Sequence, residues 1–174
     1  MSFTPGKTSL ESSEATFLLL DKKYRDTIRK TNYPESSNIQ SKYLIDYEGA
    51  SVELTFSENI LLQTQIRFGD KNIKIDDVLL KFGEPTSIHS KWISAHNQQC
   101  YGSYLYYPEK GISVGLGDCG GDSLVIGQVD SSTPVISIHY TPQVKSTQDM
   151  ILFFFDDRPN TDLKNWSGFG IYAP

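Results

Sequence analysis

The sequence predicts an α+β protein made of two tandem units, each with short helices packed on an antiparallel β-meander sheet. Two observations support this class. Apolar residues alternate with a period of two over much of the chain, and short turns separate these stretches. A helical pattern precedes each set of expected strands. At 174 residues the chain can bury a core without needing a metal or a disulfide.

The first unit is expected over residues 5–69. Thr8-Ser9-Leu10-Glu11 fits a capping box, in which a hydroxyl and a carboxylate close the start of a helix. We therefore expect a helix from about Ser9 to Tyr24, followed by a polar loop from Thr31 to Ser41. The alternation then predicts three strands, at Tyr43 to Tyr47, Val52 to Phe56 and Ile60 to Phe68.

The second unit is expected over residues 70–142. An apolar stripe at helical spacing predicts a short helix that Gly83 and Pro85 end, and it consists of Ile75, Val78, Leu79 and Phe82. Strands should follow at about Tyr101 to Tyr107, Ile112 to Gly117, Leu124 to Val129 and Val135 to Tyr140. Residues 143–174 should form a C-terminal tail that docks through an aromatic anchor around Trp166 and Phe169. We interpret the two units as a divergent duplication.

The two cysteines of the chain fall opposite each other in one predicted hairpin. Pro108 and Gly111 suit its turn. If Tyr107 faces Ile112, the ladder places Leu105 opposite Val114, Ser103 opposite Leu116 and Cys100 opposite Cys119. Facing positions in such a ladder lie close enough for a disulfide after small adjustment. A Cys100–Cys119 bond would indicate an oxidising compartment, and the alternative is two thiols that meet by chance.

The same hairpin offers a candidate binding face. Alternation puts Tyr104, Tyr106 and Ser113 on one side and the apolar side chains Leu105 and Val114 on the other. If a helix or a second sheet leaves the tyrosines uncovered, they would provide contact area, because Tyr is favoured at protein interfaces. If they are covered, they belong to the core.

No motif predicts a catalytic residue, a cofactor or a metal. Gly111-Ile112-Ser113-Val114-Gly115 matches a nucleophile elbow, but its serine lies inside a predicted strand rather than on a strand-to-helix turn. Gly115 to Gly120 matches GxGxxG, but a β-rich run follows instead of the helix that a phosphate site needs. His89, His96 and His139 are too scattered for a zinc pattern.

Composition limits the partners and leaves the compartment open. Sixteen basic against twenty-one acidic side chains give a formal charge of −5, which argues against a nucleic-acid partner. No apolar run reaches the ~20 residues of a membrane helix. Met1 to Lys7 has neither segment of a signal peptide. The chain is therefore either cytoplasmic or an exported protein expressed without its leader.

One segment resembles a known family. The string Lys74-Ile75-Asp76-Asp77-Val78-Leu79-Leu80-Lys81-Phe82-Gly83-Glu84-Pro85 resembles an element of the SmpA/OmlA outer-membrane lipoprotein domain and of the repeated units of the beta-lactamase inhibitor protein. The likeness continues into Leu105-Tyr106-Tyr107-Pro108 and Gly111-Ile112-Ser113-Val114, whereas the first unit lacks the Gly-x-Pro stop. The resemblance implies tandem helix-plus-sheet units and a cell-envelope or secreted binding module without catalytic residues.

We therefore expect a non-catalytic binding or assembly module of the cell envelope or the secreted space. Its partner should be another protein, and the chain itself a monomer. It would meet a membrane only through a lipid anchor lost with its signal. The alternatives are a small-ligand carrier and a hydrolase whose site assembles only in three dimensions.

Overall fold

The computed structural model describes residues 4–13, 28–32, 34, 39, 41–47, 49–69, 73–95, 98–117, 128–151 and 163–172, without the side chains of 47, 91–95 and 98–101. The fold is α+β, with mostly antiparallel strands and few short helices. The chain divides into two compact units, one of Met1–Lys71 with His139–Pro142 and one of Asn72–Ile138 with Gln143–Pro174. That the two are copies of one fold stays a prediction.

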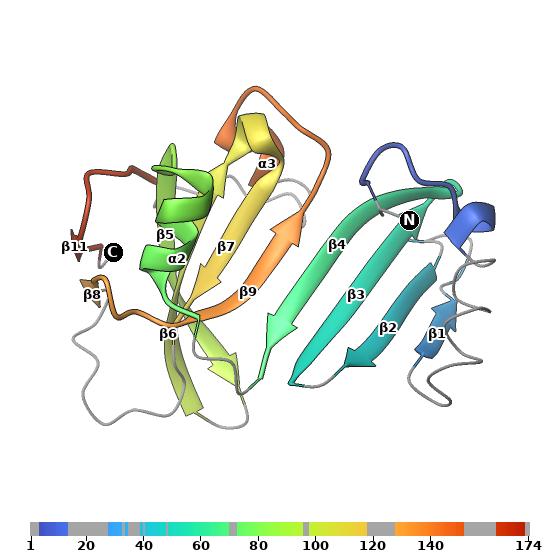
Figure 1. The fold of residues 1–174 in the computed structure, drawn as a ribbon, viewed down its shortest axis with the longest axis horizontal. Helices are drawn as coiled ribbons and strands as arrows, with labels where there is room; N and C mark the ends of the chain where they lie inside the picture. Colours follow the sequence, from blue (N-terminus) through green and yellow to red (C-terminus); the bar gives the residue numbers. More distant parts are fainter. Residues whose placement is uncertain are drawn as a thin grey trace. The chain divides into compact units, whose positions relative to one another are not determined.

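The first unit is built on four antiparallel strands that neighbour one another in chain order (Figure 1). They are β1 (Ile28–Asn32), β2 (Ser41–Tyr47), β3 (Ala50–Ser57) and β4 (Ile60–Phe68). Glu58 and Asn59 both adopt positive φ between β3 and β4, as a tight hairpin turn requires. The three predicted strands are confirmed, whereas part of the expected loop from Thr31 to Ser41 belongs to β1 and β2. Strand β1 escapes prediction because four of its five residues are polar and exposed.

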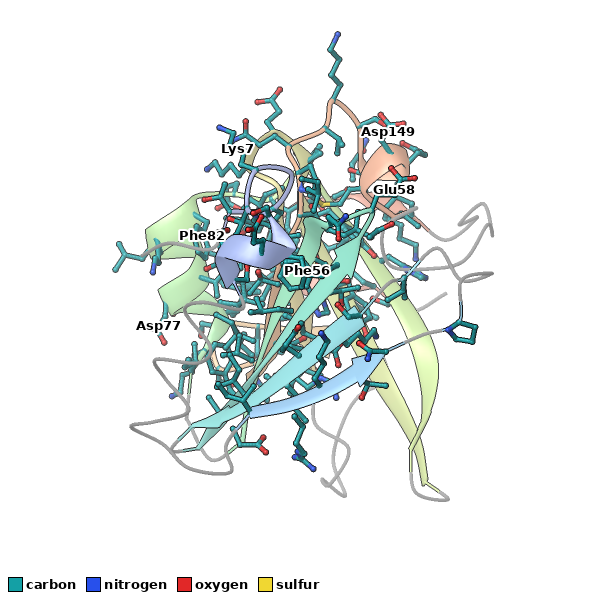
Figure 2. The ribbon with its side chains drawn as sticks, turned by 90° about the vertical axis from the view of Figure 1, so that its right-hand side faces the viewer. Lys7, Phe56, Glu58, Asp77, Phe82 and Asp149 are labelled. Carbon is teal, nitrogen blue, oxygen red and sulfur yellow. The ribbon has the colours of Figure 1, made fainter. Side chains whose placement is uncertain are left out.

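The apolar face of this sheet carries the core of the first unit. Tyr43, Leu54, Phe56 and Leu61 are buried there, and Leu10 packs against them from the helical turn at residues 10–13. Figure 2 shows Phe56 beside that turn. The rings of Tyr43 and Phe56 meet edge to face, with 5.8 Å between their centroids. This geometry suits the charge distribution of aromatic rings.

The N-terminal helix is capped one residue later than predicted. Ser9 Oγ accepts a hydrogen bond from the backbone N–H of Ser12 at 3.3 Å, so Ser9 is the capping residue. Thr8 Oγ1 instead accepts the N–H of Thr4 at 2.7 Å within the preceding turn. The rest of the helix expected up to Tyr24 lies outside the described residues.

The second unit is also built on antiparallel strands, in the spatial order β9, β7, β6, β5, β10. Their bounds are β5 (Ser87–Ala95), β6 (Gln98–Tyr107), β7 (Ile112–Leu116), β9 (Val135–Tyr140) and β10 (Lys164–Asn165). The last two residues of β9 count with the first unit. A separate pair is formed by β8 (Gln128–Val129) and β11 (Gly170–Ile171). The one-turn 3-10 helix η1 (Pro108–Lys110) joins β6 to β7.

The predicted hairpin register is confirmed. Tyr107 pairs with Ile112, Leu105 with Val114, and Ser103 with Leu116. The turn follows the predicted chemistry, since Gly111 adopts the left-handed conformation with φ 64°.

One short helix packs on each face of this sheet. On one face lies α2 (Ile75–Phe82), and Phe82 meets the ring of Tyr107 at 6.2 Å. On the other lies α3 (Thr147–Ile151), whose Met150 and Ile151 pack with Tyr106. The bounds of α2 agree with the predicted stripe, and Gly83 ends it at φ 75°.

Candidate functional site

The predicted binding face of the hairpin is largely buried. Tyr106 is 0% exposed and Ser113 is 1% exposed. Tyr104 is partly buried against the cluster that Tyr106 forms with Met150. Because α3 covers this face, Tyr106 and Ser113 offer no contact area to a partner. They belong to the core, which is the alternative that the sequence left open for this face.

Two hydroxyls on that face are buried without a hydrogen-bond partner among the described residues. Tyr106 and Ser113 sit directly opposite each other on β6 and β7, and neither Tyr106 OH nor Ser113 Oγ is satisfied. On the neighbouring strand, by contrast, Ser87 is hydrogen-bonded to Thr147 at 2.7 Å. Burial raises the pKa of Tyr106 far above its usual range, so the phenol stays neutral. Because Ser113 Oγ has no hydrogen-bond partner among the described residues, none of them activates it as a nucleophile.

The described histidines are buried. His139 lies in the first unit, where its Nδ1 is 2.8 Å from Nε2 of Gln63. Burial, with the positive charge of Arg67, lowers the pKa of His139 to about 4. His89 is buried on β5, opposite Tyr104. His139 is therefore a neutral core residue near neutral pH.

Several predictions concern residues that the structure does not describe. Cys119 and His96 lie outside the described residues, and only the backbone of Cys100 is described. The disulfide thus stays a prediction. Within the described ranges, no three His, Cys, Asp or Glu side chains gather as metal ligands, and no helix is long and apolar enough to cross a membrane.

A rigid aromatic turn lies near the C-terminus of the chain. The ring of Trp166 stacks on that of Tyr172, with 5.6 Å between centroids and 6° between planes. Tyr172 OH donates to the carbonyl of Gly168 at 2.6 Å and accepts the N–H of Ser167 at 3.1 Å. We call residues 166–172 the aromatic turn. Its hydrogen bonds and stacked rings hold one backbone conformation.

The aromatic turn is attached to the rest of the second unit through the pairing of β11 with β8 and through Trp166. The backbone N–H of Trp166 donates to the carbonyl of Thr86 at 3.3 Å. The indole N–H of Trp166 donates to the carboxylate of Glu84, which lies just after α2. The turn therefore adjoins the C-terminal end of this helix.

Large apolar side chains point into water from this region. Phe169 is 48% exposed and Ile171 is 67% exposed on the aromatic turn, while Leu80 in the last turn of α2 is 89% exposed. The sequence pointed to Trp166 and Phe169 but missed Ile171 and Leu80. The sequence did contain a signal for the exposure of Leu80. This residue lies about 200° around the helix from Val78 and therefore off the apolar stripe.

Comparisons with known proteins add little. No family model and no curated protein matches the chain. Among solved structures it is similar to a cysteine-rich secretory protein from Staphylococcus aureus subsp. aureus Mu50, with a TM-score of 0.40 and 10% sequence identity. The match covers 98% of this chain and 54% of that one, so the chain spans about half the length of its neighbour. A likeness this slight assigns neither fold family nor function.

Proposed function

We propose that this chain is a non-catalytic binding module that recognises another protein through the aromatic turn. The observation that supports the proposal is the exposure of Phe169 and Ile171 on a turn that Trp166 and Tyr172 hold rigid. Exposed apolar side chains gain free energy when a partner covers them. A turn that is already ordered loses little conformational entropy on binding.

The chemistry of the turn defines the kind of partner. The tip from Ser167 to Ile171 carries no charge, so recognition would rest on apolar burial rather than on ion pairs. An aromatic and an aliphatic side chain beside each other suit an apolar pocket on a folded protein. Leu80, which is 89% exposed in the last turn of α2, is a further apolar side chain of the same unit that a partner can cover.

The compartment belongs to the same proposal. We propose that the module works in the cell envelope or the secreted space, as two related units. The support is the confirmed hairpin register. If the ladder continues beyond Leu116, this register places Cys100 opposite Cys119, where a disulfide can form. Alkylation of the denatured protein, with and without prior reduction, tests this by intact mass. Two alkyl groups added only after reduction would support export, and two added without reduction would favour the cytoplasm.

Site-specific photo-crosslinking tests the aromatic turn. A benzophenone amino acid at position 169, in the cells that produce the protein, should give an adduct with one partner protein. The same amino acid at exposed Asp76, on the same unit, is the matched control and should not. The adduct should weaken in the Ile171→Ser and Leu80→Ser backgrounds, because each change removes exposed apolar area.

Two results would contradict the proposal. One is an adduct at position 169 that is no stronger than at Asp76. The other is an adduct that Ile171→Ser and Leu80→Ser leave unchanged. Crosslinking to lipid alone would indicate a membrane surface in place of a protein.

A further inference from the structure

The first unit contains an open pocket that no expectation from the sequence anticipated. It lies where β2 passes into β3 and where β4 ends, and its volume is about 520 Å³. Ligand sites in proteins commonly fall in this range of volume. Its lining includes Asp46, Gly49, Ser51, Arg67, Phe68 and Gly69.

The strand register explains why polar side chains meet in this pocket. Asp46 pairs with Ser51, and Ser51 pairs with Arg67, so the three lie in one row across β2, β3 and β4. Directly paired residues of antiparallel strands point to the same face of the sheet. The row therefore gathers a carboxylate, a hydroxyl and a guanidinium on one face.

The backbone closes the end of the pocket. The N–H of Gly69 donates to the carbonyl of Gly49 at 2.9 Å. Gly49 has φ 71°, a conformation that favours glycine. A side chain at Gly69 would begin 3.4 Å from that carbonyl oxygen. The two glycines therefore let the start of β3 and the end of β4 approach closely.

Among the described residues, Arg67 is the cation of the pocket that has no anionic partner. Asp46 accepts a hydrogen bond from Arg29 at 2.6 Å, which compensates its charge. Arg67 donates to the neutral amide oxygen of Gln65 at 3.2 Å. A guanidinium carries five N–H donors in a planar fork, so most of those of Arg67 stay available. The positive charge of Arg67 also repels a proton on His139 and so contributes to lowering the pKa of that histidine.

We propose that this pocket binds an oxyanion group, a carboxylate or a phosphate, through the guanidinium of Arg67. Arginine matches the geometry of both groups with two parallel hydrogen bonds. Ser51 can donate a further hydrogen bond, because its hydroxyl lies in the same row. Phe68 and Ala50, which pair with each other, also line the pocket. The site is independent of the aromatic turn, which belongs to the second unit.

Titrations followed by amide NMR test the site with acetate and with inorganic phosphate as probes. The amides of Gly49, Ser51 and Gly69 should shift and saturate with at least one probe, and sodium chloride at equal ionic strength should not reproduce the shift. Arg67→Gln should weaken binding roughly 10- to 100-fold, the usual effect of losing a charge-assisted hydrogen bond. The matched control is Lys7→Gln, which removes the same charge from an exposed position of the same unit and should bind like the wild type.

A further variant separates the two anions. Arg67→Lys keeps the charge but loses the planar fork. It should therefore weaken acetate binding more than phosphate binding, because lysine also binds phosphate well as a point charge. Because Arg67 is exposed, its replacement should leave the fold intact. Amide signals that are unchanged away from the pocket will confirm that each variant folds. Shifts that persist in Arg67→Gln, that chloride reproduces, or that never appear at these amides would overturn the proposal.

Discussion

Replacing Tyr106 by phenylalanine should stabilise the second unit. The phenol oxygen is buried and has no hydrogen-bond partner in the part of the chain that the structure describes, whereas in the unfolded chain water satisfies it. A buried polar group without a partner costs about 1–3 kcal/mol. Phenylalanine keeps the ring in the cluster with Met150 and Ile151 and removes that cost. The free energy of unfolding should therefore rise by about 1–3 kcal/mol.

Urea denaturation followed by tyrosine and tryptophan fluorescence measures this change. The midpoint should rise while the slope stays constant, since the surface exposed on unfolding is nearly unchanged. Ser87→Ala is the contrasting control, because Ser87 is hydrogen-bonded to Thr147 and its loss should destabilise by about 1 kcal/mol. If Tyr106→Phe lowers the stability instead, the hydroxyl has a partner in solution and the reasoning fails.

Two further predictions rest on single residues. The pKa of His139 is about 4 in the folded chain against 6.5 unfolded, so stability is full above pH 6.5 and falls towards pH 4 by about 3 kcal/mol. The urea midpoint of the wild type should fall as the pH is lowered across this range, and in His139→Gln most of this pH dependence should be lost. An equal pH dependence in both proteins would contradict the lowered pKa of His139. A side chain at Gly115 would begin 2.5 Å from Ser137 Oγ, so Gly115→Ala should destabilise by about 1–3 kcal/mol. Gly170→Ala meets no described atom within 4 Å and should be nearly neutral in the same urea denaturation, and equal losses at both would refute the packing argument.

Local signals predicted the elements that local chemistry decides. The stripe and Gly83 defined α2, and the turn at Pro108 and Gly111 defined the register of β6 and β7. Strand β5 gave no such signal, because Ile88, His89 and Ser90 are consecutive and all buried. A strand covered on both faces loses the alternation that identifies a half-exposed one.

The candidate sites depend on contacts between distant segments. No local pattern shows that α3 covers Tyr106, since residue 106 and residue 150 meet only in the folded chain. The exposure of Ile171 likewise follows from the stack of Trp166 on Tyr172. Arg67 and Asp46 share a pocket only because three strands align in register. Sequence reasoning predicted that Tyr106 and Ser113 share one face of the hairpin, because a single turn decides their register, but it could not show that both are buried.

The most direct test of the binding proposal is the affinity of the partner identified at position 169, measured by calorimetry with purified proteins. Phe169→Ser should weaken binding about 10-fold or more, as loss of a central aromatic anchor does. Asp76→Ser, an exposed change on the same unit, should leave the affinity unchanged. Equal affinities of the wild type and Phe169→Ser would contradict the role of the aromatic turn.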